Sequence, residues 1–172
     1  MYYHNLETCI GCGACQIACK DHNDLTPGIF FRRVDEVTLP DGIKRFMSRA
    51  CNHCKKPACL AACPNGAFYQ TEDGFVLHDD GKCIGCGRCV WACPYGAVSL
   101  NSEKGVAQKC LGCVDYRRRG EEPPCVAACV NRSLQIRGAG QGWKGTIEGV
   151  LPSDSITRPQ AQVRLSGGGG YK

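Results

Sequence analysis

The chain has 172 residues, a formal net charge of +5 and a hydrophobic fraction of 43%, which includes sixteen cysteines. Without the cysteines about a third of the residues are apolar, less than the roughly 45–50% of an ordinary domain, so we expect stability to need more than a conventional core. No apolar run approaches the roughly 20 residues of a membrane-spanning helix, and no basic stripe with aromatic platforms favours nucleic-acid binding. Residues 1–8, before Cys9, contain neither a charged leader nor the apolar stretch of a signal peptide. We therefore expect no direct membrane span, no nucleic-acid partner and no cleavable signal.

The cysteines fall into four groups of four along the chain. In order, these are Cys9, Cys12, Cys15 and Cys19; Cys51, Cys54, Cys59 and Cys63; Cys83, Cys86, Cys89 and Cys93; and Cys110, Cys113, Cys125 and Cys129. The first and third groups have the spacing C-x2-C-x2-C-x3-C, while the middle gap widens to four residues in the second group and to eleven in the fourth. Pro64 and Pro94 directly follow the second and third groups.

A short helical turn is expected at the last gap of each group, and β structure follows it. Three β-hairpins are predicted after the first three groups, with turns at 40–42, 71–74 and 101–105. After the fourth group, residues 133–136 are expected to form a single strand. The chain therefore repeats one unit four times, made of a cysteine loop, a short helix and a strand or hairpin.

Three kinds of site use cysteine at this density. Disulfide scaffolds have an even cysteine count, but cysteines two residues apart rarely pair and such domains seldom repeat one spacing. Zinc sites use C-x2-C pairs, but none requires the further x3 interval. Iron–sulfur clusters match best, because C-x2-C-x2-C-x3-C-P is the bacterial ferredoxin run in which the fourth cysteine binds a second cluster. Gly11, Gly13, Gly85 and Gly87 let the loops wrap closely around such a cluster.

The fourth cysteines decide how the groups pair. The second and third groups lie at a normal ferredoxin interval and both precede a proline, which favours a pair between them. The first and fourth groups would then form a second, enclosing pair. The spacing alone also allows a sequential arrangement, in which the first group pairs with the second and the third with the fourth.

Several stretches resemble the iron–sulfur (beta) subunit of molybdopterin oxidoreductases, in particular the dimethyl sulfoxide reductase B-subunit type. They include C-K-D-H-N-D-L-T-P over 19–27, F-R-R over 31–33, C-N-H-C over 51–54, D-G-F-V over 73–76, C-P-Y-G-A over 93–97, K-C-L-G-C over 109–113 and T-R-P over 157–159. The resemblance implies an α+β fold of two bacterial-ferredoxin-like units, built from short helices and β-hairpins and nested on one chain. Residues 1–50 with 110–137 would form one unit and 51–109 the inserted unit. Residues 138–172, which lack cysteine and end in a glycine run, would form an extended arm with a flexible tail.

The resemblance also implies which cysteines hold each of four 4Fe-4S clusters. Cluster A would be held by Cys9, Cys12, Cys15 and Cys129; cluster B by Cys110, Cys113, Cys125 and Cys19; cluster C by Cys51, Cys54, Cys59 and Cys93; and cluster D by Cys83, Cys86, Cys89 and Cys63. Cys86 is present where some relatives lack the cysteine and hold a three-iron cluster, so all four clusters are expected to be 4Fe-4S. Counting each cluster with its thiolates as −2 changes the expected charge of the oxidised protein from +5 to −3.

The function that the resemblance implies is that of a non-catalytic electron-transfer subunit of an oxidoreductase complex. It would relay electrons between a molybdopterin-containing catalytic subunit and a membrane anchor subunit or soluble redox partner, as in anaerobic respiration. A free-standing polyferredoxin that shuttles electrons between soluble enzymes is the alternative. The compartment stays open between the cytoplasm and a membrane-associated or periplasmic site, because relatives can be exported folded with their catalytic partner.

Three further features carry expectations about the surroundings of the clusters. Trp91 and Tyr95, next to predicted ligands, are expected to form a dry wall that controls solvent access. His53, between two ligands of cluster C, is expected beside the ligands rather than on iron. The arginine run over 117–119 is expected either in a solvated loop, or as a partner contact or a charge that raises the potential of a nearby cluster.

Overall fold

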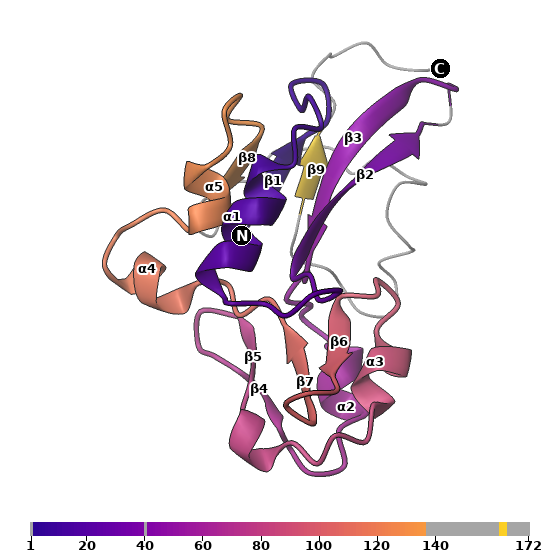
Figure 1. Cartoon of the computed structure of the whole chain (residues 1–172), viewed down its shortest axis with the longest axis vertical. Helices are drawn as coiled ribbons and strands as arrows, with labels where there is room; N and C mark the ends of the chain where they lie inside the picture. Colours follow the sequence, from indigo (N-terminus) through magenta and orange to yellow (C-terminus); the bar gives the residue numbers. More distant parts are fainter. Residues whose placement is uncertain (1, 40, 137–161, 165–172) are drawn as a thin grey trace.

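The computed structural model describes residues 2–39, 41–136 and 162–164, the last three by their backbone alone. Within these ranges the chain forms an α+β fold of short helices and small antiparallel hairpins (Figure 1). In chain order the elements are β1 (Tyr2–Asn5), α1 (Ala14–His22), β2 (Arg32–Thr38), β3 (Lys44–Ala50), α2 (Ala58–Ala61), β4 (Phe68–Gln70), β5 (Val76–His78), the 3-10 helix η1 (Asp80–Lys82), α3 (Arg88–Ala92), β6 (Val98–Asn101), β7 (Val106–Lys109), α4 (Val114–Arg118), α5 (Pro124–Ala127), β8 (Leu134–Ile136) and β9 (Gln162–Arg164). The predicted fold class is confirmed.

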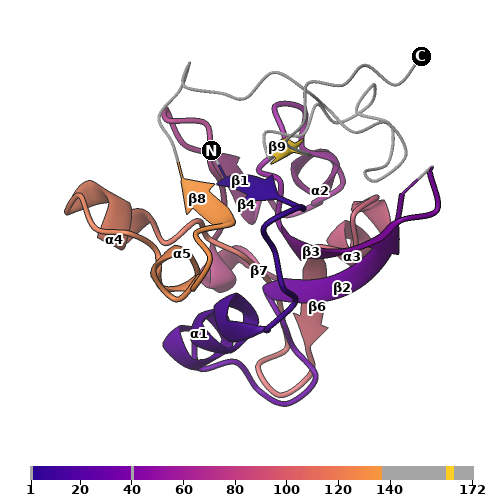
Figure 2. The same cartoon turned by 90° about the horizontal axis from the view of Figure 1, so that it is seen from above.

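Strand β1 brings the first and last cysteine groups together. It pairs with β8 in antiparallel register, with Tyr3 opposite Gln135, and with β9 in parallel register along its other edge. Figure 2 shows β1 between these two strands. Helix α1 packs against α5, so the first and fourth groups share one half of the molecule, the upper half in Figure 1.

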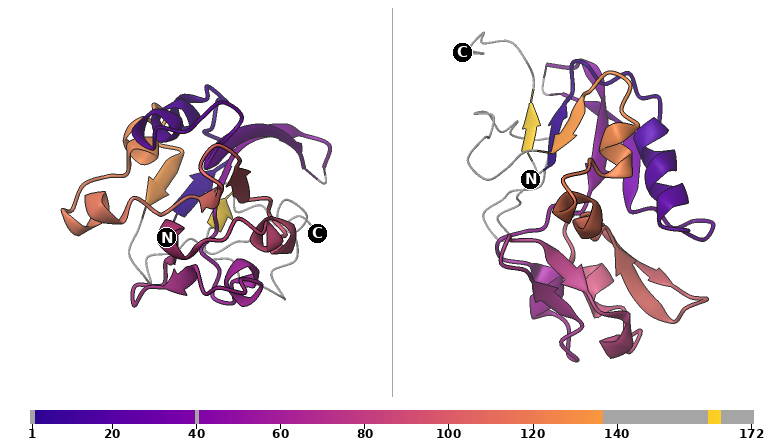
Figure 3. Two further views of the ribbon diagram at one scale, coloured as in Figure 1. Left: turned by 60° about the horizontal axis from the view of Figure 1, so that its bottom comes forward. Right: turned by 90° about the vertical axis from the view of Figure 1, so that its left-hand side faces the viewer.

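The second and third cysteine groups share the other half. Helix α2 packs against α3, and the hairpins β4–β5 and β6–β7 lie beside these helices, as the right-hand view of Figure 3 shows. All three predicted hairpins are present. The β2–β3 hairpin is the longest, because its pairing continues from Thr38 and Lys44 to Arg32 and Ala50.

Each half has its own apolar cluster, and cysteines belong to both. The larger cluster contains Tyr2, Leu25, Ile29, Phe31, Phe75, Val126 and Leu134 with Cys15, Cys19, Cys110 and Cys125. The smaller cluster contains Phe68, Val76, Val98 and Ala107 with Cys89. Phe75 crosses the division, because it belongs to the turn between β4 and β5 in one half and packs in the core of the other. The core therefore encloses thiols and ties the two halves together.

Three described elements are not indicated by the sequence pattern: β1, η1 and α4. The predicted arm over 138–172 lies outside the described residues except for β9, and its glycine-rich tail lies entirely outside them. In the ranges that the structure describes, no helix has both the length and the apolar character needed to cross a bilayer.

Candidate iron–sulfur sites

The residue two positions after the first cysteine of each group has a left-handed backbone. Its φ is +71° at Gly11, +42° at His53, +68° at Gly85 and +71° at Gly112. Glycine adopts this conformation readily, and it turns the amide back toward the cysteine. The N–H groups of His53 and Gly112 each donate to a cysteine sulfur at 3.4 Å, that of Cys51 and of Cys110 respectively. Such hydrogen bonds stabilise a thiolate at the first ligand position of the loop.

The last cysteine of each group accepts another hydrogen bond from a residue shortly after it in the chain. The sulfurs of Cys63, Cys93 and Cys129 accept from the N–H groups of Ala67, Ala97 and Leu134 at 3.3, 3.4 and 3.3 Å. At Cys19 the donor is the side-chain amide of Asn23, 3.8 Å away. The repeat therefore extends beyond the ligand spacing to the groups that stabilise charge on the sulfurs.

Two cavities collect cysteines from different groups. One encloses about 340 Å³, part of it open to solvent, and its lining includes Cys9, Cys12, Cys15 and Cys129. The other encloses about 350 Å³, also partly open, and its lining includes Cys51, Cys54, Cys59 and Cys93. Each cavity combines three cysteines of one group with the last cysteine of another, and these are the sets predicted for clusters A and C. The thiols ring the cavities, and among the described residues no three His, Cys, Asp or Glu side chains converge as around a single metal ion.

Thiols in each of the other two predicted sets affect one another electrostatically. Burial raises the pKa of Cys19 above the usual range, and the nearby thiols of set B raise it further, Cys110 most strongly. Burial also raises the pKa of Cys89, and Cys83 and Cys63 of set D add to this effect. Thiols of this kind must lose their protons to bind iron, so cluster binding releases protons. The cavities, the clustered thiols and the N–H groups that donate to their sulfurs fit a 4Fe-4S cofactor.

The four sets lie next to one another in the order A, B, C and D. Helix α1 carries ligands of both set A and set B. Burial raises the pKa of Cys110 in set B to about 11, and the next largest contribution comes from Cys51 in set C. Helix α3 carries Cys89 of set D, and Cys93 of set C directly follows its last residue, Ala92. The candidate sites therefore follow one another as a row of neighbours, from A to B, B to C and C to D, and they occupy both halves of the molecule.

Two basic side chains are buried along this row. Arg32 is 3% exposed, and its Nη1 donates to Ser48 Oγ at 2.9 Å, while this hydroxyl lies 3.3 Å from Cys15 Sγ. Burial opposes the guanidinium charge, but nearby thiolates, Cys125 foremost, raise the pKa of Arg32. Lys109 is 1% exposed and lies where the two halves meet. Buried cations at these places offset the negative charge of thiolates and clusters.

Two family models match the chain, and both are described as "4Fe-4S dicluster domain". One covers residues 43–138 and the other covers residues 1–64. The chain is 39% identical to the B subunit of the anaerobic dimethyl sulfoxide reductase of Escherichia coli (strain K12), over 95% of this chain and 87% of that protein. The chain belongs to the 4Fe-4S dicluster family. The corresponding subunit from Haemophilus influenzae is 37% identical, over 96% of this chain and 92% of that protein.

Within the 4Fe-4S dicluster family, the relatives are electron-transfer subunits rather than catalytic ones. The thiosulfate reductase electron transfer subunit PhsB of Salmonella typhi, for example, is 40% identical over 77% of this chain and 72% of that protein. Two dicluster domains correspond to four 4Fe-4S clusters, in agreement with the four cysteine groups. The predicted cofactor and the predicted non-catalytic, electron-transfer role are confirmed.

The surroundings of the dicluster sites differ from expectation at Trp91. Its side chain is 90% exposed, so the expected dry wall is wrong for this residue. Trp91 follows the buried Cys89 by two residues on α3, and this interval places it on the opposite side of the helix. Tyr95, by contrast, lines the cavity of set C. His53 is buried beside the ligands, as expected, and its Nδ1 accepts a hydrogen bond from the N–H of Val76 at 3.2 Å.

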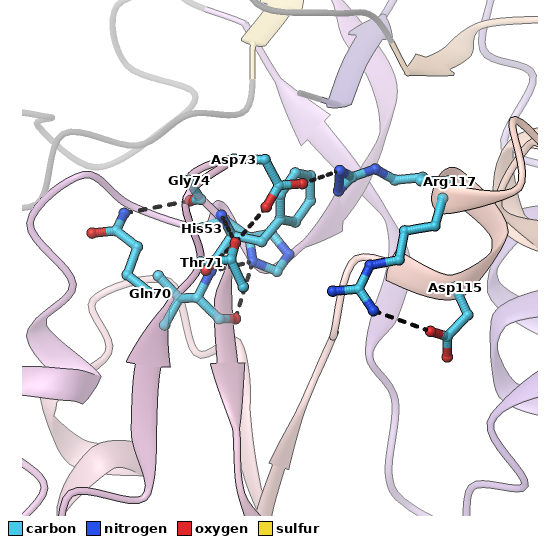
Figure 4. A network of polar contacts seen from close by, with 10 residues as sticks. His53, Gln70, Thr71, Asp73, Gly74, Asp115 and Arg117 are labelled. Carbon is cyan, nitrogen blue, oxygen red and sulfur yellow. Dashed lines mark hydrogen bonds and ion pairs between the residues drawn. The ribbon is translucent and has the colours of Figure 1, made fainter.

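Arg117 also departs from expectation, because it makes an internal contact. Its guanidinium pairs with Asp73 in the turn of the other half and lies 3.6 Å above the centre of the Phe75 ring (Figure 4). The side chain is 19% exposed. The side chains of Arg118 and Arg119 are 74% and 53% exposed, as expected, but Arg118 is the last residue of α4 and does not lie in a loop. The arginine run therefore divides into one residue that joins the halves and two that face solvent.

Neither buried cation, Arg32 or Lys109, was predicted from the sequence, although the sequence holds a signal for one of them. A signal for Lys109 was present, since strand residues two apart lie on the same face and Ala107 is an apolar residue that the strand buries. A lysine in phase with that alanine and directly before a ligand cysteine was therefore a candidate for burial. No comparable alternation marks Arg32, because the faces of β2 are not cleanly divided between buried and exposed residues.

Proposed function

We propose that this chain passes electrons through its four 4Fe-4S clusters between a molybdopterin-containing catalytic subunit and a second redox partner, either a membrane anchor or a soluble protein. The proposal is supported most by the way the four predicted cysteine sets follow one another as neighbours through both halves of the molecule. The relatives of this chain include proteins named as subunits of dimethyl sulfoxide reductase, thiosulfate reductase and sulfite dehydrogenase. A relay of single electrons needs such a row and needs no acid, base or nucleophile of its own.

We propose the ligand sets A to D as given above, on two nested units over 1–50 with 110–137 and over 51–109. The two cavities support sets A and C, and the mutual effects of the thiols support set B and, for Cys63, Cys83 and Cys89, set D. The pairing of β1 with β8 and the packing of α1 on α5 and of α2 on α3 support the nesting. Both lines of support favour the nested arrangement over the sequential one.

Each cluster, when bound, supplies a reversible one-electron site. Four cysteine thiolates of the chain would hold each cluster. Backbone N–H groups donate hydrogen bonds to ligand sulfurs, and the donors include residues 53, 67, 97, 112 and 134. These hydrogen bonds, the buried charges and the degree of solvent exclusion are the means by which a protein sets the potential of a cluster.

Serine substitutions test the nested pairing. Under the proposed sets, Cys19→Ser and Cys125→Ser perturb the same cluster, whereas Cys59→Ser perturbs a different one. Electron paramagnetic resonance spectra of the reduced variants, compared with a wild type that holds about 16 iron and 16 acid-labile sulfide ions, distinguish these outcomes. If the spectrum of Cys19→Ser instead matches that of Cys59→Ser, the groups pair sequentially and the proposed sets are wrong.

Purification under anaerobic conditions tests the proposed partners. A stable one-to-one complex with a molybdopterin-containing chain is expected, and its presence in the membrane or soluble fraction identifies the kind of second partner. An isolated monomer that exchanges electrons with several soluble enzymes would contradict the subunit role and indicate a free-standing polyferredoxin.

A further inference from the structure

Lys109 lies where the two nested units meet. It is the last residue of β7 and directly precedes Cys110 of set B. Its Nζ donates to the carbonyl oxygen of Cys110 at 2.8 Å, to the sulfur of Cys51 at 3.5 Å and to the carbonyl oxygen of Val76. One amine therefore contacts a ligand residue of set B and a ligand sulfur of set C.

The contacts of Lys109 match a charged amine. An ammonium group has three N–H donors and accepts no hydrogen bond, and Lys109 has three acceptors. The side chain is 1% exposed, so water does not screen the charge. In the described part of the chain, no carboxylate forms an ion pair with it. A buried charge needs compensation, and the negative charge available at this place is that of the thiolates and their clusters.

We propose that the Lys109 ammonium sets the reduction potentials of clusters B and C and thereby controls electron transfer between the two nested units. The inference rests on the ligand sets of the proposed function. One added electron gives a cluster one more negative charge, and a fixed positive charge beside the ligands stabilises it, so the ammonium raises both potentials. In the transfer itself one cluster loses the electron that the other gains, and no bond or proton moves. The positive charge of Lys109 therefore stabilises the transferred electron both on cluster B and on cluster C.

The amine lies beside ligand residues of both neighbouring sites. Its Nζ is 3.5 Å from the sulfur of Cys51 in set C and 2.8 Å from the carbonyl oxygen of Cys110 in set B. A positive charge at this place therefore favours negative charge in two neighbouring sites at once.

Three variants of the full holoprotein separate the charge of Lys109 from its structural role. Lys109→Gln keeps a hydrogen-bond donor and removes the charge, whereas Lys109→Arg keeps the charge. Lys82→Gln is the matched control, because Lys82 precedes Cys83 in the same way but its side chain is 63% exposed. Redox titration followed by electron paramagnetic resonance gives the potential of each cluster, and the serine variants described above assign the signals.

We expect Lys109→Gln to lower the reduced-to-oxidised ratio of clusters B and C about tenfold at a fixed ambient potential, which is about 59 mV for a one-electron couple. The larger shift is expected at cluster C, because the sulfur of Cys51 is itself an acceptor of the amine. Clusters A and D keep their potentials, Lys109→Arg stays near the wild type, and Lys82→Gln leaves clusters B and C unchanged.

Unchanged potentials in a Lys109→Gln protein that holds four clusters would overturn this inference and leave the proposed function intact. A wild type without four clusters would instead overturn the proposed function. If Lys109→Gln fails to retain its clusters, the inference is tested instead with wild-type protein labelled with ¹⁵N-lysine, by measuring whether a lysine nitrogen lies beside a cluster. A ¹⁵N hyperfine coupling to a reduced cluster, lost in Lys109→Arg, supports the contact on which the inference depends, and its absence overturns it.

Discussion

At the residue scale, the cluster loops leave no room for a side chain at certain glycines. Gly85 lies between two predicted ligands of cluster D, has a φ of +68°, and a Cβ atom there would lie 2.4 Å from the carbonyl oxygen of Gly105. Gly105 itself has a φ of +66° but open space where its own Cβ would lie. The two glycines therefore share the left-handed backbone, and they differ in whether a methyl group meets another part of the backbone.

This difference predicts unequal effects of alanine at the two positions. We expect Gly105→Ala to lower the free energy of unfolding by about 1 kcal/mol, from backbone strain alone. Gly85→Ala is expected to lower it by about 3 kcal/mol, because the loop must also move away from Gly105, and to reduce the occupancy of cluster D. Denaturant unfolding and iron analysis of both variants check this. Equal losses would show that the close approach at Gly85 has no effect.

A buried histidine predicts a dependence of stability on pH. Burial lowers the pKa of His4 to about 4, and the positive charge of Arg32 contributes to the shift. An unfolded histidine has a pKa of about 6.5, so between pH 6.5 and pH 4 the unfolded chain binds a proton that the folded chain does not. Stability is therefore expected to fall as the pH falls through this range, by about 2 kcal/mol between pH 6.5 and pH 5 from His4 alone.

Substitution of His4 isolates this contribution. In His4→Gln the free energy of unfolding is expected to vary less with pH than in the wild type, when both holoproteins are unfolded by denaturant at several values between pH 5 and pH 7. The exposed His22 provides the control, and His22→Gln is expected to keep the slope of the wild type. If His4→Gln and His22→Gln show the same slope, the buried imidazole does not cause the dependence.

At the scale of the elements, α4 is joined to the β4–β5 hairpin by Arg117. The guanidinium stacks on Phe75 and pairs with Asp73, and both residues belong to the turn of that hairpin (Figure 4). We expect Arg117→Ala to lower the free energy of unfolding by about 1 to 2 kcal/mol, because a partly buried cation–π contact and an ion pair are lost together. Arg118→Ala, next to it and 74% exposed, is the control and is expected to have little effect. Denaturant unfolding measures both, and similar midpoints for the two variants would contradict the role of Arg117.

The same scale shows which elements could be predicted. The three hairpins were accessible to prediction, because each has a glycine-containing turn between two runs of strand-forming residues. Strand β1 was not, since its four residues carry no local signal and are ordered by pairing with β8 and β9. Trp91 shows a related limit. Its position beside a ligand is visible in the sequence, but its exposure depends on which face α3 turns inward.

At the scale of the whole molecule, the pairing of the cysteine groups is the least local feature. The ligand spacing identifies each loop, yet it allows nested and sequential pairing equally, because the fourth cysteine reaches a partner far away in the chain. The nested pairing that we propose is supported by contacts such as that between α1 and α5, whose residues lie about a hundred positions apart. The contacts of Lys109 belong to the same scale, because its amine meets ligand residues of sets B and C only when both halves of the molecule are folded around it.

Cysteines make up part of the buried core of the whole molecule. The buried apolar side chains include five cysteines, namely Cys15, Cys19, Cys89, Cys110 and Cys125. Both apolar clusters are thus built around thiols, and the proposed fourth ligands connect one cysteine group to another in each half. Without iron, no metal–sulfur bonds connect the cysteine groups, and the cysteines are neutral thiols instead of thiolate ligands.

Folding is therefore expected to require the clusters. We expect the apoprotein, kept reduced and free of oxygen, to lose most of its circular dichroism signal and its cooperative unfolding transition, because binding free energy at such sites is folding free energy. Reconstitution with iron and sulfide should restore both together with the visible absorption of the clusters, which excludes irreversible damage as the cause of the loss. An apoprotein with a cooperative melt like that of the holoprotein would show that the small apolar clusters alone suffice to specify the fold.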